Sequence, residues 1–305
     1  MPSIAVLGSG GVGGFVAAAL ARARANVVLV AREPAATALT LTGVSVRSTA
    51  LGNFVAHPGV VSELTDPVDV LLVATKAAGL TPALDRIHSE PGLVVPLLNG
   101  LEHLSVLRER FGSGRVVAGV IRVESDRPRP GEIVQASPAC RIDIAGTRAD
   151  VIALTQSLEH AGIAVRTGDS EPNVLWSKLM RLCPLALTTS ASDRPLGFVR
   201  SDPRWRSALD NAVAETARVA AAGGAALDPA VTLAELESAH AELGSSMQRD
   251  IAAGREPELD AIAGAVLRAG ARRGIRCPTI EWLAGRVAQR AGISGWARSG
   301  ATAGA

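Results

Sequence analysis

Short apolar runs of strand length recur through the first hundred residues, separated by segments of mixed or alanine-rich composition. Four of them are strongly apolar and cover residues 3–7, 26–30, 68–74 and 92–98. A run that is apolar at nearly every position is typical of a strand buried on both faces of a sheet. Behind the first run, the alanine-rich segment 15–23 predicts a helix. Strands that alternate with helices predict a parallel sheet with right-handed crossovers.

The pattern then weakens and, after residue 173, becomes helical. Before that point we expect a short helix and two weak strands within 34–66 (at 44–47 and 54–56), a helix at 101–111, a strand at 116–123, a proline-containing loop at 124–131, edge strands at 133–135 and 141–145, a helix at 150–160 and a strand at 164–167. Beyond a linker at 168–172, helices are expected over 173–183, 204–223, 231–253 with a break near Gly244, 258–274 and 279–290, with a frayed tail from Gly292. The predicted fold class is α/β, with an N-terminal Rossmann-type parallel sheet domain over 1–168 and a C-terminal all-helical domain over 172–305.

Composition excludes several classes of protein. The 305 residues are 48% hydrophobic with a net charge of +2, which indicates a soluble globular protein without a basic surface for nucleic acid or an acidic membrane. No apolar run approaches the ~20 residues that span a bilayer, and no signal peptide is expected. Three cysteines without metal-ligand spacing predict reduced thiols in a cytoplasmic protein: Cys140, Cys183 and Cys277. With no Tyr, a tyrosine acid is excluded, and five histidines are expected at the surface: His57, His88, His103, His160 and His240.

A glycine-rich loop follows the first strand and opens the first helix. It consists of Gly8, Ser9, Gly10, Gly11, Val12, Gly13 and Gly14. In this setting GxGxxG predicts a dinucleotide site: Gly8 permits the tight turn, Gly10 lets the backbone approach a pyrophosphate, and Gly13 lets helix and strand pack closely. The helix N-terminus then presents its N–H groups to the phosphates. The alternative is a glycine-rich turn without a ligand.

Three further polar residues stand where predicted strands end. They are Arg32, Lys76 and Asn99. Ligands of parallel sheets bind beyond the carboxyl ends of the strands, so these residues are candidates for the same site. Arg32 suits a 2′-phosphate and favours NADP. Glu33 is the argument against NADP, because it could bind the ribose hydroxyls of NAD. Alternatively, Glu33 is an exposed loop charge without a ligand.

Lysine is rare in this chain. Of 31 basic residues only Lys76 and Lys178 are lysines. A lysine can give up a proton at accessible pH whereas an arginine stays charged, so each lysine marks a position where a guanidinium could fail. The alternative is that the two lysines have no functional cause, and their positions in the fold decide between these explanations.

These residues, with two segments of the helical half, resemble the ketopantoate reductase (2-dehydropantoate 2-reductase) family. The resemblance covers nearly the whole chain. It rests, in order, on the glycine loop with Arg32, Lys76, Leu-Asn99-Gly, Trp-x-Lys178-Leu, and Ser-Ser246-Met-x-x-Asp250 followed by Glu258.

The resemblance implies NADPH-dependent reduction of a 2-oxo acid to a 2-hydroxy acid, with ketopantoate to pantoate as the first expectation. Lys178 is implied as the proton donor to the reduced carbonyl, and an ammonium suits a developing alkoxide. Asn99 is implied to touch cofactor and substrate, and Ser246 to bind the substrate's carboxylate end. Glu258 is implied at the cofactor–substrate junction, and Lys76 on the cofactor side. The alternatives are a solvated Lys178, a helix N-cap at Ser246 and a helix-terminal charge at Glu258.

The chain departs from the family on the helix of Lys178. Four and eight residues further on the family has two substrate-binding asparagines, where this chain has Leu182 and Ala186. Pro184 lies between them and predicts an end or a kink of the helix. Hydroxyls at 188–190 could replace the lost amides. Because the two asparagines are missing, the substrate could be a different, more apolar 2-oxo acid. A non-catalytic NADP-binding regulatory protein is the other alternative. A small 2-oxo acid is the expected partner, with a homodimer as one possible assembly.

Overall fold

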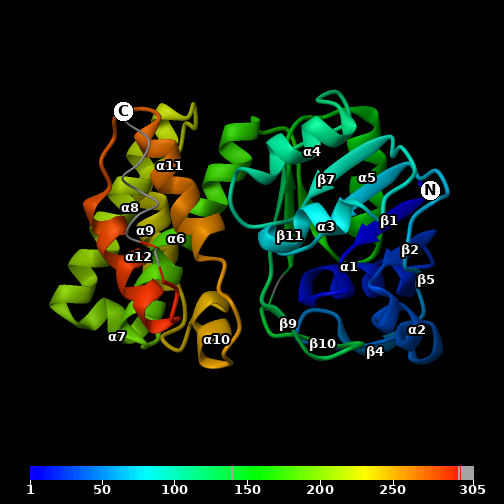
Figure 1. Cartoon of the computed structure of the whole chain (residues 1–305), viewed down its shortest axis with the longest axis horizontal. Helices are drawn as coiled ribbons and strands as arrows, with labels where there is room; N and C mark the ends of the chain where they lie inside the picture. The colour runs from blue at the N-terminus through cyan, green and yellow to red at the C-terminus, as the bar shows by residue number, and fades with distance from the viewer. Residues whose placement is uncertain (139, 295, 297–305) are drawn as a thin grey trace. The chain divides into compact units, whose positions relative to one another are not determined.

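The computed structural model describes residues 1–138, 140–294 and 296 (Figure 1). Contacts divide the described chain into two compact units. The first comprises Met1–Leu98 and Glu102–Val174, and the second comprises Asn99–Leu101 and the chain from Leu175 onward. The tripeptide Asn99–Leu101 thus belongs with the helical unit although its neighbours on both sides belong to the first. The frayed tail expected from Gly292 lies mostly outside the described residues.

The first unit is built on a parallel five-stranded sheet of order β5-β2-β1-β6-β7. Its strands are β5 (Gly59–Val61), β2 (Val27–Val30), β1 (Ile4–Leu7), β6 (Val70–Val73) and β7 (Leu93–Pro96). Every residue of β1, β6 and β7 is buried, as the continuous apolar runs predicted. The edge strand β5 was not predicted, because three half-exposed residues carry too little pattern.

Helices connect the strands of this unit. They are α1 (Gly11–Arg22), α2 (Glu33–Thr42), the short 3₁₀ turn η1 (Ala77–Gly79), α3 (Leu80–Leu84), α4 (His103–Phe111) and α5 (Ala149–His160). Residues 13–20 of α1 are buried without interruption. Their small side chains suit this environment, because α1 contacts β1 and β2 of the main sheet and also β3, β4, β9 and β10 of a second one.

Two smaller sheets complete the first unit. One has the order β4-β3-β10-β9 and the other β12-β11-β8. Their strands are β3 (Val44–Ser48), β4 (Gly52–Ala56), β8 (Gly119–Arg122), β9 (Ser125–Arg129), β10 (Glu132–Gln135), β11 (Arg141–Ile144) and β12 (Ala164–Arg166).

Two predictions for this region were wrong. The segment 124–131 is not a loop, because it contains β9, which pairs with β10. Pro128 is tolerated there because β9 is an edge strand. β10 is not an edge strand, because it pairs with β3 on one side and β9 on the other. β11 is likewise an inner strand, paired with β12 and β8.

The second unit is helical in the part that the structure describes. Its elements are α6 (Glu171–Ser192, whose first turn belongs to the first unit), α7 (Leu196–Ser201), α8 (Pro203–Ala222), α9 (Pro229–Ser238), α10 (Ser246–Ala252), the π-helix η2 (Asp260–Gly264), α11 (Ala265–Ala271) and α12 (Pro278–Arg290). Asp202, Asp228 and Ser245 cap α8, α9 and α10 with their side chains. The break expected near Gly244 within 231–253 separates α9 from α10, and the predicted 258–274 helix contains a π-helix.

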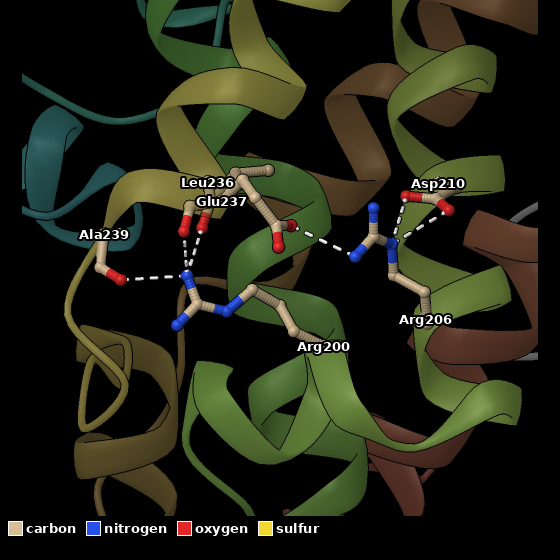
Figure 2. Close-up of polar contacts among 6 residues, drawn as sticks. All are labelled: Arg200, Arg206, Asp210, Leu236, Glu237 and Ala239. Carbon is tan, nitrogen blue, oxygen red and sulfur yellow. Dashed lines mark hydrogen bonds and ion pairs between the residues drawn. The ribbon is translucent and has the colours of Figure 1, made fainter.

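The end of α9 is held by a side chain from α7. Arg200 Nη1 donates to the carbonyl oxygens of Leu236 (3.0 Å), Ala239 (2.9 Å) and Glu237 (Figure 2). Arg206 on α8 pairs with Asp210 and with Glu237. The Arg200 guanidinium thus satisfies carbonyls at the end of α9, and Arg206 adds ion pairs with two carboxylates.

Helix α6 runs through Pro184 without a break, contrary to the prediction of an end there. A proline inside a helix costs about 3 kcal/mol, since one backbone hydrogen bond is missing. Packing offsets this cost: Leu179, Cys183 and Leu187 of α6 are nearly inaccessible and lie in the main apolar core of the unit. None of the helices described is long and apolar enough to span a membrane.

Candidate active site

The glycine loop has the geometry of a phosphate cradle. Gly8 adopts φ +111°, a conformation that L side chains rarely adopt. A Cβ on Gly13 would stand 1.9 Å from the Gly8 carbonyl oxygen, so only glycine allows this approach of α1 to β1. A Cβ on Gly10 would meet no atom within 4 Å in the described structure. The loop is therefore closed around Gly8 and Gly13 and open at Gly10.

The N-terminus of α1 fits an anionic group. Its N-cap is Gly10, no side chain caps it, and its first turn carries no acidic residue. Backbone N–H groups at such an end bind phosphate. Ser9, Gly11 and Val12 are half-buried along the same loop.

Two residues that the sequence analysis missed adjoin this loop. Ser125 of β9 donates its hydroxyl to the Gly11 carbonyl oxygen at 2.8 Å. Thr75, two residues after the end of β6, lies beside Gly8. Its Oγ1 is buried and has no hydrogen-bond partner in the described part of the chain. A buried hydroxyl without a partner is costly, so a bound polar group would satisfy it. Nothing in the sequence pattern distinguished either residue.

Arg32 and Lys76 stand at the same edge of the main sheet as the glycine loop. β1 lies between β2 and β6, and all three are parallel, so their carboxyl ends share one edge. Arg32 follows β2 as the exposed N-cap of α2, and Lys76 follows β6 as the exposed N-cap of η1. Glu33 is also exposed, in the first turn of α2. The side chains of Arg32 and Lys76 are both accessible, and Glu33 stays the alternative ligand, for the ribose of NAD.

The helical unit brings Asn99 and Glu258 together. Asn99 Nδ2 donates to Glu258 Oε2 at 2.8 Å across 159 positions of sequence. Both side chains are half-buried. The hydrogen bond orients the carboxylate and occupies one donor of the amide, which leaves the amide oxygen as an acceptor.

Lys178 and Ser246 lie in the same unit. Lys178 is half-buried on α6 between the buried Trp176 and Leu179. Ser246 is the exposed first residue of α10. The cap of α10 is Ser245, whose hydroxyl accepts from Gln248 N at 3.1 Å. Capping therefore does not explain Ser246, and its role in binding stays a prediction.

The apolar character of α6 extends beyond Lys178. Leu182 is half-buried against the core of the unit, and Ala186 is fully buried in it. The hydroxyls that could have replaced the lost amides are engaged elsewhere: Thr188 donates to Pro184 O, and Thr189 to Leu185 O, each at 2.7 Å. Ser190 Oγ lies 3.4 Å from Ser245 Oγ. These three residues are at most 1% exposed, so they are unavailable to a ligand.

The histidines and cysteines do not add to this site. Four histidines are exposed as predicted, but His103 at the start of α4 is buried, so that prediction was wrong. The sequence pattern did not distinguish this buried position from one on a charged helix face. The three cysteines are reduced and buried.

A parallel sheet of Rossmann order, a glycine cradle at a bare helix N-terminus and a helical second unit define a nicotinamide-dependent oxidoreductase. Two family models match the chain: Ketopantoate reductase PanE/ApbA over residues 4–145 and Ketopantoate reductase PanE/ApbA C terminal over residues 173–291. The chain belongs to the ketopantoate reductase family, whose members are oxidoreductases acting on CH–OH or ketone groups. The fold prediction is thereby confirmed.

Individual relatives cover most of the chain. The 2-dehydropantoate 2-reductase of Caulobacter vibrioides is 30% identical over 91% of this chain and 95% of its own. The crystal structure of 2-dehydropantoate 2-reductase from Geobacter metallireducens has a TM-score of 0.86 at 26% identity, covering 94% of this chain and 99% of that one. A ternary structure of D-mandelate dehydrogenase with NADH and anilino(oxo)acetate has a TM-score of 0.84 at 22% identity, covering 95% and 98%.

Proposed function

We propose that the protein catalyses NADPH-dependent reduction of a 2-oxo acid to a 2-hydroxy acid, with ketopantoate as the first candidate substrate and Lys178 as the proton donor. The observation that carries the proposal is the hydrogen bond between Asn99 and Glu258, in the same unit as Lys178. This hydrogen bond holds the neutral Asn99 amide and the Glu258 carboxylate at a fixed separation. Relatives named 2-dehydropantoate 2-reductase support the substrate.

The proposed chemistry divides between the two parts of the chain. Residues 1–168 bind the cofactor through Gly8–Gly13, Arg32 and Lys76, and residues 172–305 carry the groups that act on the acid. When bound, the nicotinamide supplies the hydride. Lys178 Nζ stabilises the alkoxide oxygen that develops on the substrate and gives it a proton. An arginine could stabilise this charge but could not readily give up the proton.

Asn99, Ser246 and Glu258 orient the acid in this proposal. The exposed hydroxyl of Ser246 binds the substrate's carboxylate. The Asn99 amide contacts cofactor and substrate, and its bond to Glu258 fixes both side chains before substrate arrives.

NADP is the proposed cofactor because Arg32 and Lys76 are both accessible at one edge of the sheet. A guanidinium there suits a 2′-phosphate. NAD is the alternative, with Glu33 as the ribose ligand. Titration of the purified protein with NADPH and with NADH, and again after Arg32→Ala, tests this choice. Tighter binding of NADPH that is lost on Arg32→Ala supports NADP, while tighter binding of NADH contradicts it.

A second candidate is a 2-oxo acid more apolar than ketopantoate. Leu182 and Ala186 add no polar group to α6 near Lys178, and the hydroxyls of 188–190 are buried and engaged. A site without partners for a substrate hydroxyl discriminates poorly in its favour. The shared fold also occurs in a D-mandelate dehydrogenase, named for an aromatic 2-hydroxy acid.

Rates of NADPH oxidation with ketopantoate and with 2-oxo acids that lack its hydroxymethyl group separate the two candidates. A clear preference for ketopantoate with a low KM supports the first. A higher kcat/KM for an acid without the hydroxyl supports the second. If no tested 2-oxo acid is reduced while NADPH binds, the result favours the alternative of a non-catalytic NADP-binding regulatory protein. Cytoplasmic residence and a homodimer remain predictions, which fractionation and light scattering test.

A further inference from the structure

The tripeptide Asn99–Leu101 contacts the segment around Glu258 at two consecutive residues and the core of the helical unit at the third. Asn99 donates to the Glu258 carboxylate. Gly100 lies against the backbone of Ala261, and Leu101 packs on the apolar core of the helical unit. The hydrogen bond and the backbone contact together fix the position of the segment more firmly than the hydrogen bond could alone.

Gly100 is constrained in two independent ways. Its φ of +92° is a conformation that L side chains rarely adopt. A Cβ at this position would stand 2.3 Å from the Ala261 carbonyl oxygen, about 1 Å short of the 3.4 Å at which ordinary contact begins. The obstructing atom is backbone, so it cannot rotate away. Any side chain would therefore push Asn99 and Glu258 apart.

The segment that Gly100 contacts is a π-helix. η2 spans Asp260–Gly264, and Ala265 N bonds to Asp260 O, five residues earlier. Such turns are rare and occur frequently at functional sites. This one begins two residues after Glu258, and the Glu258 carbonyl oxygen accepts from Ile262 N.

An ion pair spans the π-helix from its first residue. Arg268 Nη1 donates to Asp260 Oδ1 at 2.7 Å and Nη2 to Oδ2 at 3.1 Å. The pair lies over Gly264, where a Cβ would stand 2.5 Å from Asp260 Oδ1. The bidentate geometry favours one orientation of the turn.

We propose that Gly100 and the Asp260–Arg268 ion pair are positioning elements, which hold the Asn99–Glu258 pair in register for reduction of the 2-oxo acid. They touch neither substrate nor cofactor in this account and act through Asn99 and Glu258. The role in turnover rests on the proposed function. The positioning itself does not, and can be measured without activity.

Gly100→Ala tests the proposal against the matched control Gly112→Ala. Gly112 ends α4 with a similar φ of +85°, but a Cβ there would meet no atom within 4 Å in the described structure. Both variants bear the backbone strain of alanine at positive φ. Only Gly100→Ala adds the clash, so any difference between them reports on the contact with Ala261.

The first readout is turnover. A displacement of about 1 Å can lower a rate by about 10²-fold. We expect Gly100→Ala to lose at least about tenfold in kcat relative to Gly112→Ala. Arg268→Ala serves if Gly100→Ala does not fold, because an exposed ion pair contributes little to stability. Its kcat should fall and Arg268→Lys should recover part of it.

The second readout is the Asn99 side-chain amide, which is one of five Asn amides in the chain and can be assigned by Asn99→Ala after selective ¹⁵N-Asn labelling. Its resonances should shift in Gly100→Ala and in Glu258→Gln but stay in place in Gly112→Ala. Gly100→Ala spectra that match those of Gly112→Ala would overturn the proposal. If the unmodified protein reduces no 2-oxo acid, the proposed function fails, and the amide shift alone decides the positioning.

Discussion

Substitution of Gly10 by alanine should separate cofactor binding from folding. The residue has φ −74° and ψ −172°, which alanine adopts without strain, and its Cβ would meet nothing within 4 Å. The cost to the fold is the weaker N-cap, at most about 1 kcal/mol. A domain of this size loses about 2–4 °C in Tm per kcal/mol, so Tm should fall by no more than about 4 °C.

Binding of NADPH should suffer much more than stability. In the proposed site the pyrophosphate approaches the open side of Gly10, where the new methyl group would stand. Overpacking by one methyl costs about 1–3 kcal/mol, which is about 5- to 150-fold in Kd. Fluorescence titration measures Kd, and thermal unfolding without cofactor measures Tm.

Gly13→Ala provides the opposite case. Its Cβ would stand 1.9 Å from the Gly8 carbonyl oxygen, so α1 must move away from β1. We expect a Tm loss near the upper end of about 2–12 °C, from about 1–3 kcal/mol of strain. Gly10→Ala that binds NADPH as tightly as the unmodified protein, or that melts below Gly13→Ala, would contradict this assignment of the two glycines.

Two further predictions concern the core. Burial raises the pKa of Cys140 to about 12 and that of Cys277 to about 11, and it also raises the pKa of Cys183, so almost no thiolate exists at pH 8. A disulfide reagent should therefore titrate no thiol in the native protein and three after unfolding. Rapid labelling of the native protein would contradict the burial of these thiols. Glu215 is 4% exposed, and its carboxylate accepts hydrogen bonds from Thr279 N and Ile280 N at 2.9 Å each, at the start of α12. Glu215→Ala should therefore lower the free energy of unfolding, measured with denaturant, by about 2–4 kcal/mol, and Glu215→Gln by less. Equal stability of the unmodified protein and both variants would contradict this capping role of Glu215.

Local features of the fold could be predicted from the sequence. The glycine loop was identified because spacing and backbone freedom are properties of neighbouring residues, and Gly8 and Gly13 have the constraints that the motif predicted. The buried strands were identified because their apolar runs are continuous. Strand β9 was missed because Pro128 is excluded from inner strands but not from an edge, and the position of a strand within a sheet is not a local property.

Long-range features required the folded chain. The contact of Asn99 with Glu258 joins residues 159 positions apart, and only the family resemblance placed both in one site. The continuation of α6 through Pro184 depends on packing around the helix. The π-helix next to Glu258 has no sequence signature, and Thr75 is notable only because its buried hydroxyl has no partner among the described residues.

The proposed reaction depends most on Lys178 as the proton donor. The direct test measures steady-state NADPH oxidation with the best 2-oxo acid for the unmodified protein, Lys178→Ala and Lys178→Arg, together with NADPH affinity. A general acid contributes about 10²–10⁴-fold, so both variants should lose this much in kcat and still bind NADPH. Arginine keeps the positive charge but cannot readily give up a proton. Turnover by Lys178→Arg within a few-fold of the unmodified protein would contradict the assignment of Lys178 as the acid.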